Sequence, residues 1–249
     1  MIFESNFYDN SKKHTTAPSA IGSSVIGIKY DKGVIIAGDN KVNVHGYKKF
    51  TNISRIAPIN KNTIMGSSGE YSDFQELNRI LVEKATEDEL YDGSNSFLGP
   101  KEFSNYLSFT CYQKRSKMDP YWNTTIIGGI DENGTPYLNS VDQFGTRYQN
   151  NYLVSGFGLY FAGPILDNSV PKDHTQLTKE KAVELMDTVF RVLFYRDATA
   201  GDRIFYGVIE TGVNGADPSF NLLEKKLQTN WEHDLFKKSH NERYHPMAN

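Results

Sequence analysis

Cysteine and histidine, which commonly ligate metals or take part in catalysis, are few in this sequence and are scattered along it. Cys111 is the only cysteine, which excludes an intrachain disulfide and a cysteine-based metal site. The histidines stand in predicted loops and near the two ends, as His14, His45, His174, His233, His240 and His245. None forms an i, i+4 pair on a predicted helix, and phosphate-binding loops, dinucleotide fingerprints and Ser/His/Asp signatures are absent. The sequence therefore predicts neither a metal nor a cofactor.

Composition and charge set the class of protein. The 249 residues are 38% hydrophobic and 13% aromatic, which is enough for one sizeable core. The formal charge is −3 and the charged residues are mixed along the chain, so no basic face for nucleic acid is expected. Residues 1–14 lack a signal-peptide apolar run, and no stretch is long enough to cross a bilayer. We expect no nucleic-acid partner, no membrane, and a location in the cytoplasm and nucleus.

Short β-branched segments bounded by turn residues predict the strands. Residues 24–30 and 33–39 are joined by a turn and predict an opening hairpin. Further strands are predicted at residues 53–57, 63–67, 122–130, 137–141 and 203–210. A loop is expected at residues 88–99.

Apolar residues at helical spacing predict four helices between these strands. The first carries Phe74, Leu77, Ile80, Leu81 and Ala85 on one face. The second begins near Pro100, the third spans 156–166, and the fourth spans 178–195 with Thr178 as its N-cap. Two stacked antiparallel sheets with helix pairs on their outer faces would bury all the apolar faces. The predicted fold is a single α+β domain, a four-layer αββα sandwich.

Four segments, in this order, resemble the β-type subunits of the 20S proteasome. They are Gly22-Ser23-Ser24-Val25 with the hairpin that follows, Arg55 in Asn-Ile-Ser-Arg-Ile, Gly-Phe-Gly-Leu at 156–159, and Tyr-Arg-Asp-Ala-Thr-Ala-Gly at 195–201. Each is weak alone, but their order and spacing together identify the family. The segment 112–123 and the run at 191–197 are similar to hallmarks of the inactive seventh β position of the ring. The resemblance covers roughly residues 15–231 and implies a fold like that of the N-terminal nucleophile hydrolases.

Active members of that family use a threonine that self-cleavage makes N-terminal. Its hydroxyl is the nucleophile, and its free α-amine, with a pKa of about 7.7 to 8.0, or a nearby water serves as the base. Ser23 stands at the matching position behind Gly22. Cleavage there would expose a hydroxyl and an amine together, so one alternative is a self-processed N-terminal serine/threonine-type peptidase that uses Ser23.

The groups that would support such a nucleophile are missing by the same resemblance. Arg55 stands where active relatives carry a lysine, and its guanidinium stays protonated with a pKa above about 12. Phe157 and Leu159 replace the serines of the glycine motif, and Ala200 replaces a further serine. The resemblance therefore implies an inactive subunit of a threonine-type endopeptidase complex. Its vestigial positions are Ser23, Asp39, Arg55, Asp197 and Ala200.

The charged members of this set are expected to form a structural network. Arg55 should pair with Asp39, with Asp197, or with both, in a buried or half-buried position. Ser23 and Ser24 are then ordinary small polar residues at the start of a strand.

The resemblance also implies the domain organisation and the partners. Residues 1–21 are predicted to be an N-terminal extension or short propeptide, 22–228 the β-type domain, and 229–249 a C-terminal extension. Partners would be other β subunits in the same and the opposite ring and subunits of the α ring, in a particle for ATP/ubiquitin-dependent protein degradation. A free-standing binding module of the same fold is the other alternative.

The C-terminal extension has the composition of an assembly clamp. Trp231, Leu235 and Phe236 would form a small apolar anchor on a short helical turn, followed by a polar stretch at 237–243. Similar subunits use such an extension to reach the opposite β ring. The alternative is a disordered tail.

Overall fold

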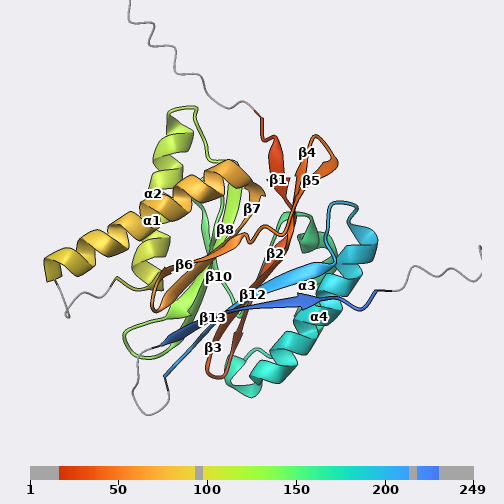
Figure 1. Cartoon of the computed structure of the whole chain (residues 1–249). Helices are drawn as coiled ribbons and strands as arrows, with labels where there is room; N and C mark the ends of the chain where they lie inside the picture. Colours follow the sequence, from red (N-terminus) through yellow and green to blue (C-terminus); the bar gives the residue numbers. More distant parts are fainter. Residues whose placement is uncertain (1–16, 93–97, 213–217, 230–249) are drawn as a thin grey trace, which may run out of the picture.

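The computed structural model describes residues 17–92, 98–212 and 218–229 (Figure 1). Across these residues the order is strands, two helices, strands, two helices and strands, as predicted. Two antiparallel sheets lie face to face, and each carries a helix pair on its outer side. The predicted αββα sandwich is confirmed.

The first sheet has the strand order β10-β9-β8-β7-β1-β4-β5, with β6 paired to β7. Its strands are β1 (Ala20–Gly22), β4 (Lys41–Val44), β5 (Tyr47–Thr51), β6 (Ile56–Asn60), β7 (Thr63–Glu70), β8 (Asn123–Ile130), β9 (Pro136–Val141) and β10 (Arg147–Gln149). The three-residue strand β1 lies between β7 and β4, with Gly22 opposite both Gly69 and Val42. The chain thus passes through the first sheet immediately before it enters the second.

The second sheet has the order β11-β2-β3-β12-β13. Its strands are β11 (Tyr152–Ser155), β2 (Val25–Tyr30), β3 (Gly33–Asp39), β12 (Arg203–Glu210) and β13 (Ser219–Lys226). The predicted opening hairpin is β2–β3, which pairs Tyr30 with Gly33 at its turn. The space between the sheets is filled by buried aliphatic side chains and Phe205, the aliphatic ones being Val25, Val34, Ile36, Ile56, Ile64, Ile126, Ile130, Leu138, Leu153 and Ile209.

Each helix pair buries its apolar stripe on one sheet. The helices are α1 (Tyr71–Asp92), α2 (Pro100–Ser116), α3 (Leu159–Ser169) and α4 (Lys179–Arg196). Pro100 opens α2, and the Thr178 hydroxyl accepts a hydrogen bond from the Lys181 backbone N–H, as the predicted N-cap requires. Cys111 is buried between α1, α2 and the first sheet, and burial raises the pKa of its thiol to about 12. The described helices include none with the length and apolarity that a membrane crossing requires.

Some predicted boundaries were wrong. Residues 88–92 belong to α1 rather than to a loop, because helix-favouring residues and the Lys84–Glu87 ion pair carry the helix onward. The strand predicted at 53–57 is β6, shifted to Ile56–Asn60; it contains Pro58, which is tolerated because β6 pairs only with β7. The third helix begins at Leu159, after a 3-10 turn at Gly156–Gly158. Strands β1, β4, β5, β10, β11 and β13 were not predicted; several of them have only three to five residues, which is too few for a clear alternation.

Candidate functional site

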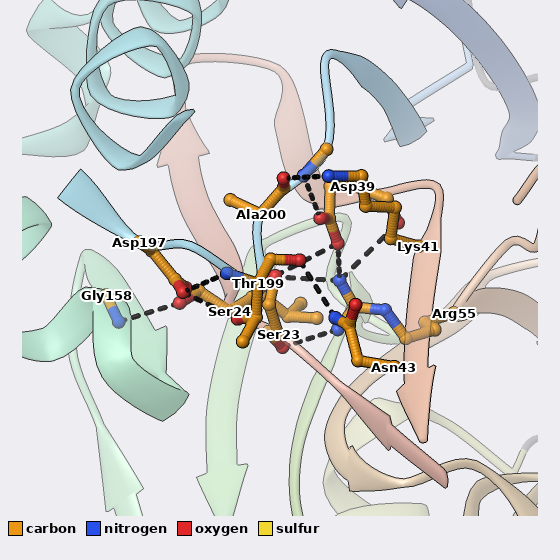
Figure 2. A network of polar contacts seen from close by, with 12 residues as sticks. Ser23, Ser24, Asp39, Lys41, Asn43, Arg55, Gly158, Asp197, Thr199 and Ala200 are labelled. Atoms are coloured by element: carbon orange, nitrogen blue, oxygen red, sulfur yellow. Dashed lines mark hydrogen bonds and ion pairs between the residues drawn. The ribbon is translucent and has the colours of Figure 1, made fainter. Parts of the chain in front are cut away.

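The vestigial positions converge at the edge where the two sheets meet (Figure 2). Ser23 and Ser24 join β1 to β2, and Asp39 is the last residue of β3. Arg55 directly precedes β6, and residues 197–201 join α4 to β12. The tertiary fold therefore brings together residues that lie up to 178 positions apart in the sequence, from Ser23 to Gly201.

Arg55 is the centre of this cluster and is 1% exposed. Its guanidinium forms an ion pair with the Asp39 carboxylate, which is equally buried. Nη1 also donates to the carbonyl oxygen of Ser23 at 2.5 Å and to that of Ser67 at 3.3 Å, while Nη2 reaches the carbonyl oxygen of Ser24 at 3.3 Å. The predicted pairing of Arg55 with Asp39 is confirmed, and the pair is buried. The guanidinium fork thus ties β1 and the start of β2 to β3 and β7.

The Asp39 carboxylate is held from several sides. The Ser23 hydroxyl donates to Oδ1 at 3.0 Å, and the Gly201 backbone N–H donates to Oδ2 at 2.5 Å. Burial raises the pKa of the Asp39 carboxyl, whereas the charge of Arg55 and the Gly201 and Ser23 donors act in the opposite direction. Each opposing group stabilises the charged form, so the ion pair depends on the whole set of donors.

Gly22 leaves the space that Arg55 fills. A Cβ atom at Gly22 would lie 2.2 Å from Cδ and 2.8 Å from Nε of Arg55. The glycine before Ser23 therefore has a packing reason that does not involve cleavage.

Asp197 lies beside this ion pair but forms its own contacts. Its Oδ1 accepts hydrogen bonds from the Thr199 backbone N–H at 2.8 Å and from the Thr199 hydroxyl at 2.6 Å. Oδ2 is buried and has no hydrogen-bond partner among the residues that the structure describes. Among the described residues, Arg55 forms its ion pair with Asp39. The predicted alternative, a pair between Arg55 and Asp197, does not form. Asp197 instead caps the turn that delivers Gly201 to Asp39.

Two side chains that the sequence analysis did not single out anchor this turn. Lys41 Nζ donates to the Ala200 carbonyl oxygen at 2.5 Å, and Asn43 Nδ2 donates to that of Thr199 at 2.9 Å. Both lie on β4, where they alternate with Val42 and Val44. That alternation of polar and apolar residues is the signal that could have found them.

The glycine-motif turn is fastened to the other side of the cluster. The Gly158 backbone N–H donates to the Ser24 hydroxyl at 2.7 Å, and Figure 2 shows this contact. Phe157 is half exposed, and its ring lies 5.3 Å from that of Phe161 between ring centres. Leu159 is also exposed. The turn therefore presents apolar side chains, and no hydroxyl, at positions 157 and 159.

Beside Ser23 lies a cleft of about 400 Å³. Its walls include Ile21, Trp122, Phe144 and Phe157, with Ser23 on one side. Among the described residues that line it there are two carboxylates, those of Asp142 and Asp197, and no lysine, arginine or histidine. Ser23 thus borders a cleft whose described lining mixes apolar and polar side chains and contains no nitrogen base.

Comparison with known proteins decides the family. The family model described as proteasome subunit matches residues 20–209, which include the cluster, the cleft, the first sheet and all strands of the second sheet up to β12. The chain belongs to the proteasome subunit family. The predicted resemblance to β-type proteasome subunits is confirmed.

Relatives of this proteasome subunit match most of its length. Proteasome subunit beta type-4 of Xenopus laevis is 39% identical over 88% of this chain and 88% of the relative. The protein of the same name from Arabidopsis thaliana is 37% identical over 92% of this chain and 89% of the relative. Proteasome subunit beta type-7 of Saccharomyces cerevisiae is 36% identical over 89% of this chain and 85% of the relative. The chain is therefore similar to β-type subunits over most of its length.

Two further predictions concern this proteasome subunit. In the described ranges, 17–92, 98–212 and 218–229, no group of three or more His, Cys, Asp or Glu side chains could hold a metal ion. The predicted assembly residues Trp231, Leu235 and Phe236 lie outside the described residues. Their role stays a prediction.

Proposed function

We propose that this chain is a non-catalytic, structural β subunit of the 20S core particle. It would contact other β subunits in its own and the opposite ring and subunits of the α ring, and serve ATP/ubiquitin-dependent protein degradation. Family membership supports a place in the core particle. The non-catalytic role rests on the chemistry around Ser23.

One observation supports the proposed inactivity: the Arg55 guanidinium is fixed in a buried ion pair with Asp39. The Ser23 hydroxyl donates to the same carboxylate, whose charge the guanidinium already balances. The carboxylate already accepts from Ser23, Arg55 and Gly201, and a guanidinium has donors only and cannot act as a base. Phe157, Leu159 and Ala200 supply no hydroxyl to orient a water. A nucleophile without an oriented base is a poor catalyst.

Electrophilic labelling tests the inactivity. Assembled particles treated with a reagent that modifies N-terminal threonines should show adducts on other β subunits and none on this chain, because Ser23 lacks an oriented base. Intact-mass measurement of every subunit reports both results at once, and the labelled subunits serve as the internal control. An adduct on Ser23 would overturn the proposal.

The self-processed peptidase remains the second candidate because one contact favours it. The Ser23 hydroxyl is within 3.0 Å of a carboxylate and borders an open cleft. Such an enzyme must begin at Ser23, since its base is the free amine of that residue. The mass of the mature chain, read from the same spectra, separates the two functions, because a chain that retains Gly22 cannot use that amine.

The structural role predicts an effect of the C-terminal extension. Deleting residues 231–249 should leave the sandwich intact but weaken the joining of two half-particles, because the apolar anchor would be lost. Native gels should show half-particles accumulating. A chain with Trp231→Ala, Leu235→Ala and Phe236→Ala should behave like the deletion, whereas deleting 237–249 alone should have a smaller effect. Unchanged full particles from the full deletion would exclude the clamp.

A further inference from the structure

Exposed aromatic residues and arginines gather on the surface that α2 and the β9–β10 turn form. Helix α2 contributes Phe109, Tyr112 and Arg115, the β9–β10 turn contributes Phe144, and β10 contributes Arg147. Phe109 is 59% exposed, Tyr112 55% and Phe144 50%. We call this surface the α2–β10 face. Because β10 is the edge strand of its sheet, the face also borders unpaired backbone groups.

The two elements that carry this face are held together closely. The Ser108 hydroxyl donates to the Gly145 carbonyl oxygen at 2.5 Å. Gly145 has φ +84°, and a Cβ atom there would lie 2.6 Å from the Ser108 carbonyl oxygen. Between helix and turn runs an open groove of about 370 Å³, lined by Asn105, Ser108, Phe109, Tyr112, Gly145 and Arg147. The groove is thus formed by rigid elements rather than by a loop alone.

Neither arginine of the face pairs with an acidic side chain in the part of the chain that the structure describes. The Arg115 guanidinium lies 5.8 Å from the ring centres of both Tyr112 and Phe144, a distance at which cation–π attraction acts. Among the described residues, no carboxylate forms an ion pair with Arg115 or Arg147. Two other exposed arginines do have such partners: Arg79 pairs with Glu76 and Glu83, and Arg203 pairs with Glu224. The face therefore offers two positive charges beside exposed rings on a chain whose net charge is −3.

This combination selects the chemistry of an occupant. Aromatic residues and arginine dominate the energetic centres of protein interfaces, and arginine binds carboxylates through two parallel hydrogen bonds. A second copy of the chain, docked symmetrically, would set its own Arg115 and Arg147 against the same charges, which is unfavourable. A segment in which carboxylates flank an aromatic or long aliphatic side chain fits this face. Its carboxylates would pair with the two arginines, and its apolar side chain would fill the groove.

We propose that the α2–β10 face binds an acidic segment of a neighbouring subunit, with an apolar side chain in the groove and carboxylates on Arg115 and Arg147. This inference rests on the proposed function, since it requires the chain to be part of a particle. The groove of this face is distinct from the Ser23 cleft, although Phe144 borders both surfaces.

Photo-crosslinking in the assembled particle tests the contact. A photoreactive phenylalanine analogue in place of Tyr112 should join this chain to one acidic peptide of another subunit, identified by mass spectrometry of the digest. The same analogue at Tyr160, which is exposed on α3, controls for random capture. A particle that contains the chain but gives no crosslink, or one to a second copy, a nucleic acid or a peptide without acidic residues, overturns this inference and leaves the proposed function standing. Absence of the unmodified chain from every particle would instead overturn the proposed function.

Charge reversal gives a second, quantitative test. Arg115→Glu with Arg147→Glu should lower the fraction of the chain that enters particles roughly tenfold, because like charges then face each other. Lys172→Glu with Lys181→Glu makes the same change in net charge at exposed residues before and on α4, and should leave incorporation unchanged. Equal incorporation of the two double variants would contradict the proposal. Circular dichroism of both purified chains checks that neither is unfolded.

Discussion

Replacing Arg55 by alanine should lower the free energy of unfolding of the chain by about 3 to 5 kcal/mol, because removing one partner leaves a buried charge uncompensated. Asp39 would keep only the Ser23 and Gly201 donors. The carbonyl oxygens of Ser23, Ser24 and Ser67 would each lose their contact with the guanidinium. Urea unfolding of the purified full-length chain measures the change, and poor incorporation into particles should accompany it.

Burial is the feature that makes this ion pair matter, so an exposed pair provides the control. Arg79 pairs with Glu76 and Glu83 on α1, but its side chain is 61% exposed. Arg79→Ala should therefore leave the free energy of unfolding nearly unchanged. A double variant, Arg55→Ala with Asp39→Ala, should be less destabilised than the sum of the two single changes, since it removes both charges. If the Arg55→Ala and Arg79→Ala variants had the same free energy of unfolding, the Arg55 cluster would have to be hydrated.

The loss of unfolding free energy that Arg55→Ala causes should also depend on pH. Arg55 opposes the upward effect of burial on the pKa of Asp39, so its removal raises that pKa further. A carboxyl whose pKa is higher in the folded chain than in the unfolded chain binds more protons when folded. The stability of the folded chain therefore falls as the pH rises through the folded-state pKa. The loss should therefore be larger near pH 7 than near pH 5. A deficit that is the same at both values would argue against a buried Asp39 charge.

A lysine at position 55 separates charge from geometry. Arg55→Lys keeps a positive charge near Asp39 but lacks the planar fork that reaches both the carboxylate and the Ser23 and Ser24 carbonyl oxygens. We expect part of the stability of the original pair to be lost. No peptidase turnover should appear, because Phe157, Leu159 and Ala200 still supply no hydroxyl. New turnover in particles carrying this variant would contradict the proposed inactivity.

Local sequence patterns were sufficient for the four helices and for the longer strands other than β13. Helix α4 has an apolar face repeated over five turns and a capping threonine, and both features act within the helix itself. The β2–β3 hairpin has β-branched strands and a short turn, so pairing partners lie close in sequence. Such elements depend on neighbouring residues, which a single sequence displays.

The missed features depend on residues far apart in the chain. Strand β1 has three residues and is fixed by pairing with β4 and β7. The local sequence pattern of three residues does not predict this long-range pairing. Lys41 and Asn43 act on carbonyl groups more than 150 residues away, at Ala200 and Thr199. Whether Arg55 would select Asp39 or Asp197 also depends on how the 197–201 turn folds, since that turn directs the Asp197 carboxylate onto Thr199. Charge patterns indicated a cluster, and only the packed structure distinguishes its partners.

Gly69 illustrates the same dependence and occupies a wall of the Ser23 cleft. It has φ +101°, a conformation that L-residues with a side chain rarely adopt. It stands opposite Gly22 of β1 and Asn123 of β8. A Cβ atom at Gly69 would lie 2.1 Å from the Trp122 carbonyl oxygen, which accepts a hydrogen bond from Glu70. The position is thus restricted both by backbone conformation and by a neighbouring backbone that has little freedom to move.

Gly69→Ala should lower the free energy of unfolding by about 2 to 5 kcal/mol, combining the strain of a left-handed alanine with the overpacking against Trp122. Gly46→Ala is the matched control, because Gly46 has φ +80° and nothing lies within 4 Å of its Cβ position. Gly46→Ala should lower the free energy of unfolding only by the cost of placing an alanine at positive φ, about 1 to 2 kcal/mol. Urea unfolding of both full-length variants measures the difference, which reports the close contact alone. If the two variants lose the same stability, β8 yields to the added methyl group, and the wall of the cleft is softer than its backbone contacts indicate.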